Sequence, residues 1–340
     1  MPERTRMNEG DSTRRLRVSA VVLSHERMRE LEIVLGALKG LPVDEVLVAG
    51  DGTGEAATLV AAHAPWARLL ERPGVHLGIA GRNLAAREAI GDHLLMLDDD
   101  AYPLPGAVET MLAAFRRDPQ LAVVGGLVRE VDESGRTVAD DQPGTFDWWL
   151  RAGARGDPPP RGFRAFFFPE GASMIDRDAF LSVGGFFEPY HLMLSELDLA
   201  ARLFAAGYEV SYLPTAVFHH LRTGPSRRGH SSNPAGVRLR IRNQIWYFWL
   251  RFPPTVAARR IPAYLAFDLL TSVIRGYPAV WPAAVRDAWR ERDRVRGARD
   301  PLPRRVVRRA ELNRGRMHLR LLLAVPIARL RARTRNGPRG

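Results

Sequence analysis

The stretch LLMLDDDAYP at residues 94–103 constrains the fold of this chain more than any other. An apolar run leads directly into three consecutive aspartates, Asp98, Asp99 and Asp100. Such a run predicts a strand that is buried on both faces, and open α/β sheets bind ligands at the carboxyl ends of such strands. Adjacent carboxylates repel one another, so we expect a compensating charge, which a divalent cation and its phosphate ligands would supply. The alternative is a solvated, aspartate-rich turn.

The first hundred residues alternate between apolar runs and helical periodicity. This pattern predicts a doubly wound, mostly parallel α/β sheet. The predicted strands are residues 18–23, 45–49, 68–71 and 94–97, and the predicted helices are residues 28–38, 56–64 and 83–90. The glycine loops that follow the strands contain neither G-x-G-x-x-G nor a phosphate-binding loop with its lysine, which disfavours a dinucleotide dehydrogenase and a P-loop ATPase.

The middle of the chain continues with both kinds of element and one long polar excursion. We expect the excursion over residues 130–162 to cross the site rather than to join the core. An amphipathic helix, SELDLAARLFAA, is predicted at residues 195–206 and ends at Gly207. The other predicted elements are helices at 104–117 and 178–183 and strands at 121–129, 208–213 and 216–220.

The character of the chain changes near residue 236. Residues 236–290 place aromatic side chains between arginines, which predicts amphipathic helices that either contact an anionic membrane surface or pack against the preceding domain. Residues 291–340 form an arginine-rich tail, and the segment from residue 286 onward holds 18 arginines against five acids. The tail favours an anionic surface. A protein that binds nucleic acid through this charge would leave the ordered acidic motifs unexplained, so nucleic acid is an unlikely partner.

The composition of the chain indicates in which cellular compartment we expect the protein. The chain has no cysteine, which excludes disulfides and thiolate metal sites. Residues 1–16 are polar and charged, so we expect a loose leader and no signal peptide, and no apolar run is long enough to predict a transmembrane helix. These features predict a cytoplasmic protein, with peripheral association at the inner face of the cell membrane as the further option.

Four motifs follow one another along the chain in an order that can be compared with known families. They are the turn SHER after the first strand, the loop GDGTGE after the second, LDDDA, and SELDLAAR followed by two histidines. Over residues 18–243 this order resembles the inverting family-2 glycosyltransferases with the GT-A fold. The resemblance implies a catalytic domain at residues 17–235, a nucleotide-diphosphate-sugar donor, a glycan, lipid-linked or small-molecule acceptor, and Mg²⁺ or Mn²⁺ as cofactor.

The resemblance also implies roles for the acidic motif and the histidines. Asp98 and Asp100 match the ends of the family's D-x-D motif, which holds the metal ion against the donor diphosphate and touches the ribose. Asp98 and Asp99 are assigned to the nucleotide-sugar site, although Asp99 is the best candidate of the three for a structural role. His219 or His220 matches the histidine that completes the metal site. Neighbours on a strand face opposite sides, so the other should be structural.

SELDL resembles the family run that carries the catalytic base. Glu196 stands where the family usually has the aspartate that takes the proton from the acceptor hydroxyl, and Ser195 replaces the acid before it. Asp198 is the rival base. The two cannot share one face of a helix, so only one can point into the site, and we prefer Glu196. Alternatively, both are acids that the helix dipole favours in a first turn.

The remaining nucleotide-sugar residues come from loops. Ser24 and Glu26 lie in the turn after the first strand. Asp51 comes one position later than the family's base-binding acid, so it either substitutes for that acid or the base is not uracil. Arg82 and Asn83 match a loop that lies along the nucleotide, with a helix cap and a surface arginine as the alternative.

The sequence therefore predicts a metal-dependent, inverting glycosyltransferase of cell-surface glycan or glycolipid synthesis. A nucleotidyltransferase has a similar sheet and similar metal carboxylates. It normally carries a glycine-rich loop after its first strand, where this chain has SHER, so it ranks lower.

Overall fold

The computed structural model describes residues 15–132, 134–141, 162–222 and 233–312. In this part of the chain, strands form one ten-stranded sheet. The strands are β1 (Val18–Leu23), β2 (Glu45–Ala49), β3 (Arg68–Leu70), β4 (His93–Asp98), β5 (Ala101–Pro103), β6 (Leu121–Val131), β7 (Thr137–Asp141), β8 (Phe163–Arg164), β9 (Ala172–Asp176) and β10 (Glu209–Leu221).

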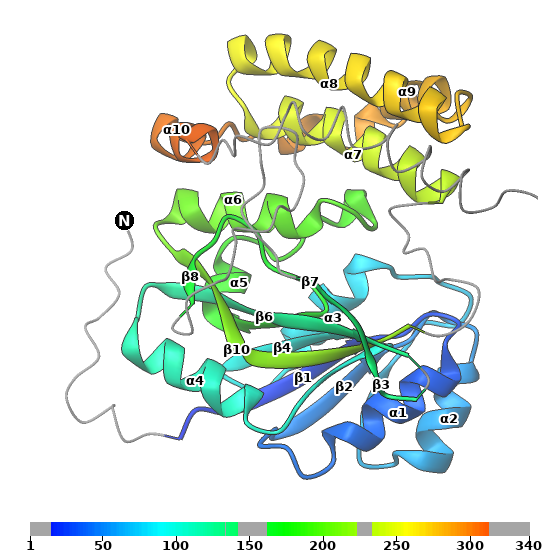
Figure 1. The fold of residues 1–340 in the computed structure, drawn as a ribbon, viewed down its shortest axis with the longest axis vertical. Helices are drawn as coiled ribbons and strands as arrows, with labels where there is room; N and C mark the ends of the chain where they lie inside the picture. Colours follow the sequence, from blue (N-terminus) through cyan, green and yellow to red (C-terminus); the bar gives the residue numbers. More distant parts are fainter. Residues whose placement is uncertain (1–14, 133, 142–161, 223–232, 313–340) are drawn as a thin grey trace, which may run out of the picture.

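Helices cover both faces of the sheet, and a further helical layer lies beyond one of them (Figure 1). The helices are α1 (Met28–Leu38), α2 (Glu55–His63), α3 (Ile79–Glu88), α4 (Ala107–Arg117), α5 (Arg177–Ser182), α6 (Ser195–Ala206), α7 (Pro234–Arg251), α8 (Pro254–Arg275), α9 (Val280–Arg290) and α10 (Arg304–Leu312).

The sheet has the strand order β3-β2-β1-β4-β9-β6-β10-β5, with β7 beside β6 and β8 beside β10. Strands β3, β2, β1 and β4 run parallel, as do β6 and β10. Strand β9 lies between these two groups and is antiparallel to both of its neighbours. The predicted α/β class is confirmed. The direction of β9 was not visible in the sequence because a strand's direction depends on the path of the chain before it.

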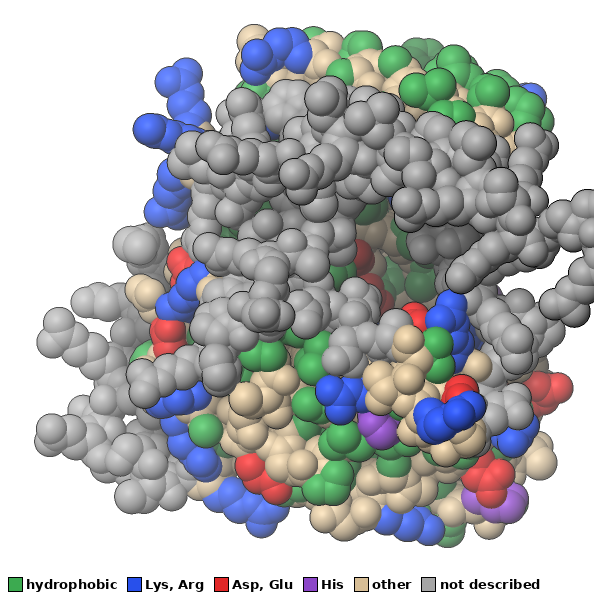
Figure 2. Space-filling model, viewed as in Figure 1, with side chains coloured by type: hydrophobic (Ala, Val, Ile, Leu, Met, Phe, Trp, Pro, Cys, Tyr) green, Lys and Arg blue, Asp and Glu red, His purple; other side chains and the backbone are tan. Residues whose placement is uncertain are grey.

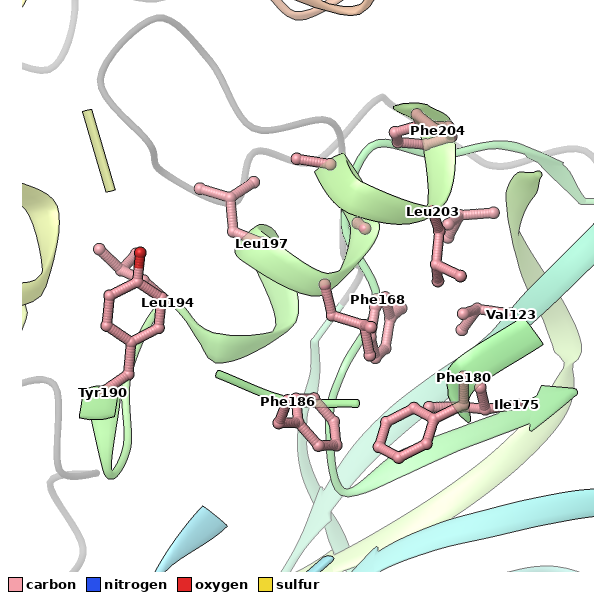
Figure 3. Close-up of a cluster of buried hydrophobic side chains, with 14 of the residues drawn as sticks. Val123, Phe168, Ile175, Phe180, Phe186, Tyr190, Leu194, Leu197, Leu203 and Phe204 are labelled. Atoms are coloured by element: carbon pink, nitrogen blue, oxygen red, sulfur yellow. The ribbon is translucent and has the colours of Figure 1, made fainter. Parts of the chain in front are cut away.

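Period-two alternation divides the core between the two faces of the sheet. Leu95 and Leu97 of β4 pack with the face covered by α1, α2 and α4, whereas Leu94 and Met96 pack with the opposite face. On that opposite face, aromatic side chains fill the space between α6 and the sheet (Figure 3). Because β4 is buried on both sides, its register is fixed, and so is the position of the aspartates at its end.

Most predicted elements are present, and the exceptions are informative. Helix α3 begins at Ile79 rather than near Asn83, so the stretch expected to be a loop is helical. The two strands predicted after α6 form one bent strand, β10, whose pairing with β6 shifts register between Leu213 and Val217. The predicted leader and tail, and most of the excursion over residues 130–162, lie outside the described residues.

The amphipathic helices expected over residues 236–290 are present as α7, α8 and α9. The aromatic side chains of α7, Trp246, Tyr247 and Phe248, are buried in the same core as α6. Helix α7 therefore packs against the sheet-containing part of the protein, and α8 and α9 pack on α7. In the described part of the chain, none of the helices has the length and apolarity that crossing a membrane requires.

Candidate active site

Three parallel strands bring separate motifs to one edge of the sheet. Leu23, the last residue of β1, pairs with Ala49 on one side and with Asp98 on the other. The SHER turn, the GDGTGE loop and the triple aspartate therefore meet at this edge. In Figure 2, acidic side chains lie in a hollow between the sheet and the outer helical layer.

Arginines of the chain itself offset part of the charge of the triple aspartate. The Arg27 guanidinium, from the turn after β1, pairs with Asp100 and lies 3.6 Å from Asp99. Asp99 also accepts a hydrogen bond of 2.7 Å from the backbone N–H of His25. Burial nevertheless raises the pKa of Asp99 to about 7, against the lowering effects of His25 and Arg27. Asp99 thus ties the turn after β1 to the end of β4, in line with the structural role expected for it.

A buried guanidinium, that of Arg82, organises the other side of the site. Its side chain is fully buried, donates to the carbonyl oxygen of Leu97 at 2.9 Å and pairs with Asp98. Its Nε donates to Oε1 of Glu170 at 3.0 Å. The position predicted for Arg82, in a loop along the nucleotide, is wrong, because α3 begins earlier and turns this side chain inward.

Asp98 is the most open carboxylate of the three, with a side chain that is 47% exposed. A Cβ on Gly171 would lie 2.2 Å from its Oδ2, so Asp98 has room only because residue 171 is glycine. Asn83, by contrast, is buried and exchanges two 2.8 Å hydrogen bonds with the backbone of Phe186. Asn83 therefore lies in α3, within the helix predicted for residues 83–90, and holds the turn at Phe186.

Glu170 links this arginine to the start of α6. Its Oε2 accepts a 2.6 Å hydrogen bond from Ser195 Oγ, which also lies 3.3 Å from Oε2 of Glu196. Burial raises the pKa of Glu170 despite Arg82 and Ser195, which lower it. Burial, followed by the charge of Glu170, raises the pKa of Glu196 to about 8. Contacts thus run from Asp98 through Arg82, Glu170 and Ser195 to Glu196.

The sequence patterns did not indicate a site role for Glu170 or Arg27. Arg27 could have been found, because it follows a strand that ends at the same edge as the aspartates. Glu170 follows a proline in a short connection, and only the antiparallel placement of β9 brings it beside α6.

Asp198, proposed as the rival base, has different partners. Its side chain is fully buried, and its two oxygens pair with Arg202 at 2.7 Å and with Arg251 of α7 at 2.6 Å. The structure does not bring it to the group formed by Glu170, Ser195 and Glu196. Asp198 joins α6 to α7, which is a packing role.

The two histidines near the end of β10 face different partners. His220 Nε2 lies 3.3 Å from Asp100 Oδ1, whereas His219 Nδ1 lies 3.3 Å from the hydroxyl of Tyr102, and burial lowers the pKa of His219. Asp100 Oδ1 is buried without a hydrogen-bond partner. A carboxylate oxygen and an imidazole nitrogen suit a divalent cation, so Asp100 and His220 fit a metal ion. Among the described residues, no ready-made cluster of three or more such ligands occurs.

The remaining predicted residues lie around the first two loops. Asp51 accepts hydrogen bonds from Thr53 Oγ1 at 2.7 Å and from the Glu26 N–H at 3.2 Å. It also lies 3.2 Å from His25 Nδ1. Burial raises the pKa of Asp51, but these hydrogen bonds outweigh it and leave the pKa lowered. Ser24 Oγ is buried without a hydrogen-bond partner, and the Glu26 side chain is 73% exposed. Asp51 thus fixes the backbone of the turn after β1.

A strained segment precedes α6 and is held from outside. His191, Met193 and Leu194 all have positive φ, which costs each of them free energy. The Asn243 amide of α7 donates to the carbonyl oxygens of Tyr190 at 3.0 Å and Met193 at 2.9 Å. These contacts from α7 fix the segment that leads into Ser195 and Glu196.

Residues 19–184 match the model of the family described as Glycosyl transferase family 2. The chain carries a family 2 glycosyltransferase domain. The predicted resemblance to family-2 glycosyltransferases is thereby confirmed over these residues. Residues of this family 2 domain include the triple aspartate, Arg82 and Glu170, while α6, the two histidines and α7 follow the matched range.

Two curated relatives are similar to part of the chain. They are N-acetylglucosaminyl-diphospho-decaprenol L-rhamnosyltransferases of Mycobacterium tuberculosis, from strains CDC 1551 / Oshkosh and ATCC 25618 / H37Rv. Each is 29% identical over 147 residues, covering 38% of this chain and 48% of the relative. The chain thus spans about half the length of the curated relatives it matches.

A solved structure supports the fold. The crystal structure of GalNAc-T7 with UDP, GalNAc and Mn²⁺ superposes with a TM-score of 0.55 at 14% identity, over 69% of this chain and 49% of that one. The GT-A fold predicted from the sequence is confirmed at this level.

We predict that Asp198→Ala destabilises the protein by about 3–5 kcal/mol, because it leaves the buried Arg251 and the largely buried Arg202 without their carboxylate. Denaturant unfolding followed by circular dichroism measures this loss. Asp178→Ala, which removes an exposed acid from α5, is the control and should cost less than about 1 kcal/mol. Equal stability of the two variants would contradict the buried role.

We predict that Asn243→Ala releases the strained segment. Hydrogen exchange at the amides of residues 190–195 should accelerate by about tenfold or more, because hydrogen bonds to its carbonyl oxygens are lost. Gln244→Ala is the matched control: Gln244 is the adjacent buried amide of α7, and it bonds to Asp268 of α8 at 3.2 Å instead. Unchanged exchange in Asn243→Ala would show that Asn243 does not hold the segment.

Proposed function

We propose that this protein transfers a sugar from a nucleotide-diphosphate donor to an acceptor hydroxyl in a metal-dependent reaction that inverts the anomeric centre. The observation that carries this proposal is the contact chain from Asp98 to Glu196. It couples an open carboxylate at the end of β4 to a carboxylate of raised pKa at the start of α6. Membership of a glycosyltransferase family and the GT-A fold support the same reaction class.

The roles of the residues follow from their chemistry. Asp100 and His220 would hold the divalent cation, with Asp98 toward the donor, and a bound cation would offset the charge on the leaving diphosphate. Glu196 would accept the proton of the acceptor hydroxyl as that oxygen attacks the anomeric carbon from the side opposite the leaving group. Arg82 would keep Asp98 in place, and Asp51 would hold the turn that faces the nucleotide.

We further propose a lipid-linked acceptor and a role in cell-surface glycan synthesis. The curated relatives are named for an L-rhamnosyl transfer to N-acetylglucosaminyl-diphospho-decaprenol, in which the acceptor carries a polyprenyl chain. An acceptor of this kind resides in a membrane. We therefore propose a cytoplasmic protein that associates with the inner face of the membrane through its basic C-terminal region, with no role for nucleic acid.

Replacement of the proposed metal ligand or base should abolish transfer. We expect Asp100→Ala and Glu196→Gln each to lower kcat by about 10²–10⁴-fold, because one removes the charge that holds the cation and the other the proton acceptor. Donor turnover is measured by release of nucleoside diphosphate from a panel of nucleotide sugars, with and without Mn²⁺ or Mg²⁺. Asp178→Asn is the control. Near-normal turnover in either site variant would refute the assignment.

The rate should depend on pH through Glu196. A base must be unprotonated, and the Glu196 pKa of about 8 means that kcat should rise about tenfold per pH unit below that value and level off above it. Glu170→Gln removes a neighbouring negative charge, so it should lower the pKa of Glu196 and move the acid limb to lower pH. Glu109→Gln, the same change at an exposed acid of α4, should leave the limb in place. An acid limb that does not move in Glu170→Gln would contradict the coupling.

A further inference from the structure

The outer face of α8 is apolar and uncovered by the described residues. Side chains at the spacing of one helical stripe point away from α7: Ala258, Pro262, Ala266, Leu269, Leu270 and Val273, which we call the α8 face. Leu269, Leu270 and Val273 are 40%, 46% and 54% exposed. In Figure 2, hydrophobic side chains gather at the corner of the molecule where Figure 1 places α8 and α9. A helix in the interior of the protein would not leave such large apolar groups in water.

The charges around this face have one sign. The acids of α8 and α9 are Asp268 and Asp287, and both are paired with arginines of α7, Arg240 at 2.8 Å and Arg238 at 2.8 Å. The exposed charged side chains of the two helices are all arginines: Arg259, Arg275, Arg286 and Arg290. Arg259 lies on the stripe itself, three positions before Pro262 and seven before Ala266. The partner of this surface should therefore be both apolar and anionic.

A second copy of this chain fits poorly on the α8 face. In a two-fold dimer the same surface faces itself, so arginines would meet arginines with no carboxylate of α8 or α9 to pair with them. An anionic bilayer satisfies both requirements. Its acyl boundary accepts leucine and valine to a shallow depth, and its headgroups attract arginine. The length and apolarity of α8 suit a helix that lies on a membrane and not one that crosses it.

We propose that the α8 face docks the protein on an anionic membrane surface, with the helix parallel to the bilayer plane. The proposal rests on the function proposed above, because it brings the enzyme to a lipid-linked acceptor. It also gives the outer helical layer a purpose. Helix α7 contacts α8 on one side and holds the segment before α6 on the other, so the docked face and the site belong to one continuous stack of packed helices.

Vesicle binding by the full chain tests this inference without any catalytic readout. Co-sedimentation is measured with vesicles of phosphatidylcholine alone and of phosphatidylcholine with phosphatidylglycerol. We expect binding to the anionic vesicles only, weakened by salt. Leu270→Glu with Val273→Glu should weaken it by about tenfold or more, and Arg259→Glu by about fivefold or more.

Matched controls test whether the loss of binding is specific to the α8 face or follows from changing any exposed apolar or charged residue. Ile33→Glu and Ile90→Glu alter isoleucines that are 40% and 54% exposed on the sheet-containing part of the chain, and Arg116→Glu reverses an exposed charge on α4. These variants should bind as the parent protein does. Equal binding by the α8 variants and the controls would overturn the proposal. So would a concentration-dependent dimer, seen by analytical ultracentrifugation, that Leu270→Glu abolishes.

Failure here is distinguishable from failure of the proposed function. Release of nucleoside diphosphate from a soluble donor does not need a membrane, so the α8 variants should keep the parent rate. Normal donor turnover with no vesicle binding would reject the docking surface alone.

Discussion

The fully buried guanidinium of Arg82 is the interaction on which the site depends. A buried cation is tolerated only when carboxylates and carbonyl oxygens surround it, because its hydration is lost. Arg82 meets this requirement with Leu97 and Asp98 from β4 and Glu170 from the connection to β9. The need to satisfy one charge therefore joins α3, β4 and β9 at the edge where the motifs meet.

The carboxylates of the site differ in the groups that pair with them. Asp98 and Asp100 each pair with an arginine, and the two oxygens of Asp198 pair with two arginines. Among the described residues, no arginine is hydrogen-bonded to Glu196, which instead shares Ser195 with another carboxylate, Glu170. Burial, followed by the charge of Glu170, raises the pKa of Glu196, the proposed base, whereas Asp198, two positions along, joins α6 to α7.

The outer helical layer contacts the region of the proposed active site directly, through α7. Asn243 and Arg251 of α7 reach opposite ends of the region around the start of α6, one fixing the strained segment and the other neutralising Asp198. Both lie beyond the range that the family model matches. The same helix packs under α8, so the surface proposed to dock on a membrane and the segment that precedes the proposed base share one support.

Local patterns in the sequence determined the elements and the reaction class. The apolar run before Asp98 fixed β4, the 3.6-residue period fixed α1 and α6, and the order of the acidic motifs indicated the family, because each of these signals depends on residues close together in the chain. Only the tertiary structure decided which side chains meet. It buries the Arg82 side chain, brings Glu170 beside Ser195 through an antiparallel strand, directs His220 rather than His219 toward Asp100, and pairs Asp198 with Arg251. These choices depend on contacts between residues distant in sequence, where burial and charge pairing act together, and no local pattern records them.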